Sequence, residues 1–173
     1  MRNAIRLFCM LVGVALLAIF ALPADTAQAQ ACPSGNWTGS FFNTTDIFAT
    51  TTPVDTVCRD RIDFDWGGGA PLFGVAADNF STEWTTTRRL PTVGTDQFSV
   101  TVEDGARLFV NQAPVITGPM DVDFNAPRTL TGFFTTSVPC QQVNIFLETV
   151  HFTGNVEVEL MENAKQIRIK PRA

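Results

Sequence analysis

The sequence has 173 residues, of which 45% are hydrophobic, and its 12 Lys and Arg against 17 Asp and Glu give a formal net charge of −5. A chain of this length matches one domain of ordinary size and leaves no room for two independent cores. The negative charge, with no run of basic residues before Lys165, disfavours nucleic acid and anionic lipid as partners.

The N-terminus has the layout of a secretory signal peptide. Arg2 and Arg6 precede an uncharged apolar stretch at 7–22, and an A-x-A cleavage motif follows at 27–29. The apolar stretch is shorter than the roughly 20 residues that a bilayer requires, although an uncleaved anchor is the alternative. We therefore predict a signal peptide at 1–29, one domain at 30–173, a secreted, extracellular or cell-envelope location, and no membrane insertion after cleavage.

From Trp37 onward, apolar and polar residues alternate with a period of two, and turn residues separate the segments. The clearest strands are predicted at 98–102, 143–147 and 156–160, where one face of each strand is apolar and the other is polar. No segment has the spacing of an amphipathic helix. Several short strands separated in this way predict an all-β protein, a two-sheet antiparallel β-sandwich or barrel.

Three cysteines remain in the mature chain, Cys32, Cys58 and Cys140. An odd number in an oxidising compartment predicts one disulfide and one leftover cysteine. The sequence does not choose the pair, but a bond between Cys58 and Cys140 would close a long loop and constrain the unfolded chain by about 4 kcal/mol. Cys32 would then be free, bridged to another chain, or lipid-modified, although the residues before it make a poor lipoprotein signal.

Four ordered blocks carry a family resemblance: WTGSFFN at 37–43, IDFDWG at 62–67, DNFSTEW at 78–84 and FSVTVEDGARLFVN at 98–111. Together they resemble the PA-fourteen family, the protective-antigen-type β-sandwich domain found in bacterial toxins, glycosidases and fungal adhesins. The similarity runs from about Trp37 to Glu162. It implies a lectin-like module that binds a polysaccharide or other glycan.

The resemblance also implies a metal site. In the sugar-binding adhesins of this family, two adjacent aspartates, often joined by a cis peptide, hold a calcium ion that coordinates sugar hydroxyls, and the matching positions here are Glu103 and Asp104. Carboxylates at a turn suit calcium, although Glu103 is one methylene longer than the usual aspartate. We predict a calcium site at this turn, with an ordinary acidic hairpin as the alternative. Asn111, and Asp121 or Asp123, are further candidate oxygen donors.

Sugar could also bind without calcium, on an exposed aromatic ring assisted by amide and acid hydrogen bonds. Phe109 beside the turn and Phe73 in the loop 67–74 are the candidate platforms, although phenylalanine is more often buried in a core. Loops at one end of a sandwich carry recognition while the strands hold them rigid. We therefore predict a binding edge formed by the turn 103–105 and the loop 67–74.

Residue patterns typical of catalysis are sparse. His151 is the only histidine, and no G-x-S-x-G motif accompanies it. Asp63 and Asp65 share one face of a strand, about 6.5 Å apart, but apolar residues on the other face indicate a solvated strand surface. We therefore predict that the protein is not an enzyme. The alternative to glycan binding is a structural or protein-interaction module of the cell envelope.

Overall fold

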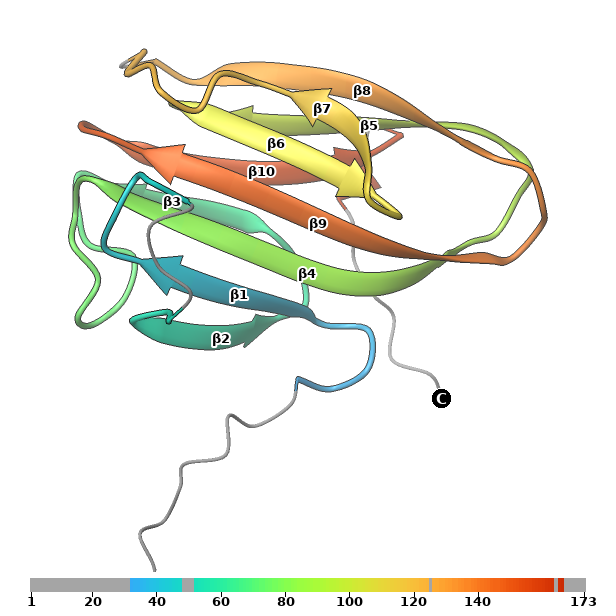
Figure 1. The fold of residues 1–173 in the computed structure, drawn as a ribbon, viewed down its shortest axis with the longest axis horizontal. Coiled ribbons are helices and arrows are strands. Elements are labelled where there is room, and N and C mark those ends of the chain that lie inside the picture. Colours follow the sequence, from blue (N-terminus) through green and yellow to red (C-terminus); the bar gives the residue numbers. More distant parts are fainter. Residues whose placement is uncertain (1–31, 48–51, 125, 164, 167–173) are drawn as a thin grey trace, which may run out of the picture.

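The computed structural model describes residues 32–47, 52–124, 126–163 and 165–166, which form eleven strands and no helix (Figure 1). The predicted signal peptide lies outside these residues. In the described part of the chain, no helix is long and apolar enough to cross a membrane. The strands are β1 (Trp37–Phe42), β2 (Asp55–Arg59), β3 (Asp63–Gly67), β4 (Phe80–Leu90), β5 (Gly94–Val102), β6 (Gly105–Val110), β7 (Ala113–Thr117), β8 (Arg128–Thr136), β9 (Gln141–His151), β10 (Val156–Glu162) and β11 (Lys165–Gln166).

The strands form two antiparallel sheets. One sheet has the order β2-β1-β4-β9-β6-β7, and the other has the order β11-β10-β5-β8, with β3 also paired to β10. The long strands β4 and β9 pair over their whole lengths and form the centre of the six-stranded sheet. The prediction of an all-β, two-sheet fold is confirmed, and the three clearest predicted strands lie within β5, β9 and β10.

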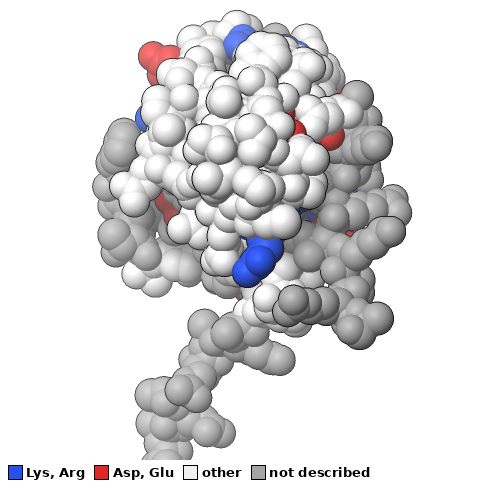
Figure 2. All heavy atoms as spheres, turned by 90° about the vertical axis from the view of Figure 1, so that its right-hand side faces the viewer, with Lys and Arg blue, Asp and Glu red and all other residues white. Residues whose placement is uncertain are grey.

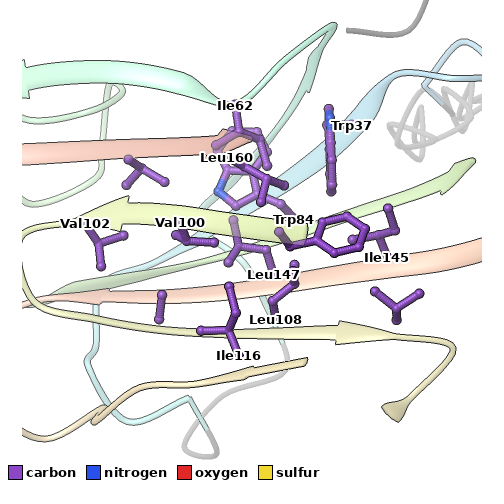
Figure 3. Packing of buried hydrophobic residues seen from close by; sticks show 14 of the residues in the cluster. Trp37, Ile62, Trp84, Val100, Val102, Leu108, Ile116, Ile145, Leu147 and Leu160 are labelled. Atoms are coloured by element: carbon purple, nitrogen blue, oxygen red, sulfur yellow. The ribbon is translucent and has the colours of Figure 1, made fainter. Parts of the chain in front are cut away.

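The core lies between the sheets and follows from the two-residue period. Trp37, Trp84 and Leu147 from the six-stranded sheet meet Val100 and Leu160 from the other, and all are buried (Figure 3). Gly39 lies against the ring of Trp84 so closely that a Cβ atom there would clash with it. Because inward and outward residues alternate, the same period leaves a second set of side chains on the outward face of the six-stranded sheet.

The disulfide joins Cys32 to Cys58, with a Cα–Cα distance of 5.5 Å, and Cys140 is an exposed free cysteine. The expectation of one disulfide and one leftover cysteine is confirmed, but the pairing of Cys58 with Cys140 that we considered is not formed. The reason is topological. Cys58 faces Thr38 across the β1–β2 pair, so the segment before β1 passes beside it, whereas Cys140 lies in the β8–β9 connection.

Candidate functional site

Asp104, at the hairpin between β5 and β6, is a buried anchor with 1% of its surface exposed. Its Oδ1 accepts a hydrogen bond from the Phe124 N–H at 3.1 Å, and its Oδ2 accepts one from the Phe152 N–H at 2.8 Å. His151 Nδ1 lies 3.1 Å from the same Oδ2. The carboxylate therefore ties the hairpin to the segment after β7 and to the end of β9, and the lone histidine has a structural partner.

Glu103 is also buried, at 6% exposed. Burial and the neighbouring charge of Asp104 raise the pKa of Glu103, although His151 and a backbone hydrogen bond to Asn155 oppose them. Both oxygens of Asp104 accept protein hydrogen bonds, and Asp123 accepts one from Thr153 Oγ1 at 2.7 Å.

Calcium requires several free oxygen ligands. No group of three or more His, Cys, Asp or Glu able to hold a metal ion occurs among the described residues, and their peptide bonds include no cis bond. Both oxygens of Asp104 would have to exchange these protein hydrogen bonds for a metal, and calcium binding by this turn stays a prediction.

The other predicted binding residues lie elsewhere. Asn111 pairs with Asn144: its Oδ1 accepts from the Asn144 N–H at 2.9 Å, and its own N–H donates to the Asn144 carbonyl at 2.8 Å. Phe109 lies near the far end of β6, about 17 Å along the strand from Asp104. Phe73 is fully exposed in the connection between β3 and β4. The structure thus brings Phe109 and Asn111 toward one region and places Glu103 and Asp104 in another.

Phe109 belongs to a groove on the outward face of the six-stranded sheet, with a volume of about 690 Å³. This volume lies in the range of small-molecule sites. The groove crosses β4, β9 and β6. Its lining consists of Thr85, Thr86, Thr87, Arg107, Phe109, Gln112, Asn144, Ile145, Phe146 and Glu148.

Strand register arranges the groove in three rows across the sheet. The central row is Thr85, Phe146 and Phe109, which are direct cross-strand neighbours. The two phenylalanine rings are tilted by 34° with centroids 6.0 Å apart. An aromatic surface of this kind suits the apolar face of a flat ligand ring.

Polar rows flank the aromatic row on both sides. On one side Arg107 lies opposite Glu148, with its Nε 2.9 Å and its Nη2 2.7 Å from Glu148 Oε2. On the other side Thr87 Oγ1 donates to Asn144 Oδ1 at 2.9 Å. The face therefore combines aromatic rings with hydroxyl, amide and charged groups. Alternation along β9 places Asn144, Phe146 and Glu148 on one face, but only the cross-strand register brings Phe146 beside Phe109.

Comparison with known proteins decides the family. The model of the PA14 domain matches residues 34–129. The chain belongs to the PA14 domain family. No curated protein matches the sequence significantly.

Solved structures share the fold of this PA14 domain. An anti-sigma factor domain-containing protein from Clostridium clariflavum has a TM-score of 0.65 at 21% identity, covering 79% of this chain and 48% of its own. The chain thus spans about half the length of that protein. A PA14 sugar-binding domain from an RTX adhesin has a TM-score of 0.52 at 15% identity, covering 80% and 96%. The A domain of epithelial adhesin 6 from Candida glabrata, in complex with Galb1-3GlcNAc, has a TM-score of 0.54 at 8% identity, covering 80% and 85%.

Glu83 extends one polar row of the PA14 domain beyond Glu148, its direct neighbour across β4 and β9. Burial raises the pKa of Glu83, and the charge of Glu148 raises it further. A carboxyl group whose pKa is higher in the folded than in the unfolded state binds its proton more tightly when folded. The protonated Glu83 therefore contributes to stability below about pH 4.5, the pKa of glutamate in the unfolded chain. This contribution is lost as the pH rises through the higher pKa of the folded state.

We expect Glu83→Gln to raise the melting temperature at pH 7, because it removes a carboxylate that is ionised at a cost beside Glu148. The gain should disappear below about pH 4.5, where Glu83 is protonated in both states. Thermal unfolding monitored across this pH range measures both effects. The matched variant Glu148→Gln should instead lower the melting temperature at pH 7, because it removes the carboxylate that pairs with Arg107. Equal shifts of the melting temperature in the two variants would contradict these different roles of Glu83 and Glu148.

Proposed function

We propose that this PA14 domain is a secreted, non-catalytic carbohydrate-binding module that holds its glycan in the groove on the outward face of the six-stranded sheet. The observation that carries the proposal is the aromatic row of Phe109 and Phe146 between two polar rows. A sugar ring has an apolar face and an edge of hydroxyl groups, so it requires both kinds of contact at once.

The groups in the groove match those requirements. Phe109 and Phe146 are half-buried, so part of each side chain is exposed in the groove. Thr85 and Gln112 supply hydroxyl and amide groups that both donate and accept hydrogen bonds, and Thr87, whose hydroxyl donates to Asn144, supplies an acceptor oxygen. All of these residues except Gln112 lie on paired strands. Their backbone is therefore already ordered before a ligand binds, which lowers the entropy cost of binding.

Three further observations support the proposal. The sugar-binding domain of the RTX adhesin and the adhesin complex with Galb1-3GlcNAc share this fold. The disulfide between Cys32 and Cys58 fits an oxidising compartment, as secretion requires. The carboxylate that lines the groove, Glu148, is held in an ion pair with Arg107, which suits ligand recognition better than proton transfer.

The test is glycan-array binding followed by titration of the best glycan against single variants. Phe146→Ala or Phe109→Ala should weaken binding by roughly tenfold to a hundredfold, as truncation of an aromatic anchor does. Phe133→Ala is the matched control, because Phe133 is 64% exposed on β8 of the opposite sheet, and it should leave binding unchanged. Circular dichroism of each variant establishes that the fold is retained.

The same titrations, repeated with a chelator and with Phe73→Ala, separate the groove from the loop edge. Binding in the groove should persist with chelator and with Phe73→Ala. Binding that the chelator abolishes and Phe146→Ala leaves intact would contradict the groove and favour calcium at Glu103 and Asp104. A domain that binds no glycan but co-purifies with a protein would support the interaction-module alternative.

A further inference from the structure

A second pocket adjoins the groove at Thr87, which lines both. This pocket has a volume of about 450 Å³ and lies between the end of β4 and the segment before β1. Arg88, Arg89 and Gln142 line it from the sheet, and the segment 32–35 forms its other wall. The disulfide between Cys32 and Cys58 holds that wall to β2. The two pockets therefore form one continuous surface.

Charge changes sign along this surface. The outward residues of β4 run from Glu83 through Thr85 and Thr87 to Arg89, so one end is acidic and the other basic. At the acidic end, Glu83 faces Glu148 across the strands, and Arg107 is already bound to Glu148. A glycan that lies along this surface would therefore meet different charges at its two ends.

Arg89 dominates the basic end. It is exposed, its cross-strand neighbour is the neutral Gln142, and it forms no ion pair with any described residue. The adjacent Arg88 also lines the pocket, but its guanidinium pairs with Glu162 at 3.0 Å. Figure 2 views the end of the sandwich where the β4–β5 and β8–β9 connections lie, and few charged side chains appear there. The guanidinium of Arg89 is thus available to a ligand.

We propose that the second pocket recognises a carboxylate of an acidic glycan through Arg89, with the neutral part of the chain on Phe146 and Phe109. This inference rests on the proposed function. A guanidinium presents parallel N–H donors that match a carboxylate in a bidentate pair. Gln142 flanks it with an amide donor. Repulsion by Glu83 and Glu148 disfavours the opposite orientation, so the acidic sugar lies at the Arg89 end.

The experiment compares a galacturonic acid oligosaccharide with its methyl ester, which has the same sugar chain without the charge. Calorimetric titration should show the acid form bound about tenfold more tightly by the unmodified domain, and the preference should shrink as salt is added. Arg89→Gln should remove the preference and leave affinity for the ester unchanged. Arg61→Gln is the control, because Arg61 lies in the β2–β3 connection beside Asp63, and it should keep the preference.

Failure of this inference is distinguishable from failure of the proposed function. Equal affinity of the unmodified domain for both forms, a preference that survives Arg89→Gln, or an array on which only neutral glycans bind would each overturn the inference. The proposed function would still stand in those cases if Phe146→Ala weakened glycan binding. Absence of any glycan binding would overturn both.

Discussion

Replacing Asp104 with alanine should lower the free energy of unfolding by about 3 to 5 kcal/mol, as loss of one partner from a buried charged network does. The substitution leaves the Phe124 N–H and the Phe152 N–H without their acceptor and removes the carboxylate beside His151. Both donors are part-buried, so the loss of their acceptor carries a desolvation cost. Urea unfolding measures the change. Because the carboxylate is buried, this variant tests stability and does not isolate a ligand contact.

Two controls make the result specific. Asp121→Ala changes an exposed carboxylate in the neighbouring segment, so it should alter stability by less than about 0.5 kcal/mol. Asp104→Asn keeps the shape and one acceptor oxygen, so it should fall between alanine and the unmodified protein. A loss of stability that appears only when calcium is present would contradict the hydrogen-bond network and indicate that Asp104 holds the metal.

Cys32→Ser should lower the free energy of unfolding by about 3.5 kcal/mol, because the disulfide closes a loop between residues 26 apart and restricts the unfolded chain. Cys140→Ser should change stability by less than about 0.5 kcal/mol, because Cys140 is exposed and unpaired. Thermal unfolding of both variants checks the pairing. A large effect of Cys140→Ser with little effect of Cys32→Ser would indicate a different disulfide.

The same bond also holds the wall of the second pocket, since residues 32–35 line it. We therefore expect Cys32→Ser to weaken the preference for acidic over esterified oligosaccharide while leaving stacking on Phe146 intact. Alkylation without reduction should label one cysteine in the unmodified mature protein, at Cys140. Labelling of three cysteines would contradict the disulfide.

The all-β class follows from local information. Alternation at 98–102, 143–147 and 156–160 can be satisfied only by strands with one buried face, because the side chains of a strand alternate strictly between its faces. The odd number of cysteines also predicts one disulfide bond from the sequence alone, because cysteines pair in an oxidising compartment and one is left over. The sequence blocks that include Trp37, Trp84 and Asp104 were sufficient to recognise the family, because they contain core residues and a turn that the fold requires.

Which residues meet is decided by strand pairing and by burial, and neither is local. Phe146 and Phe109 are 37 positions apart, and only the β6–β9 register places them side by side. Glu103 and Asp104 have the composition of an exposed acidic turn, but segments from elsewhere in the chain cover them and supply the donors for Asp104. The alternating pattern determined the sheets and their inward faces, because each strand encodes its own periodicity. The groove and the buried carboxylate arise from contacts between distant segments, which only the tertiary structure specifies.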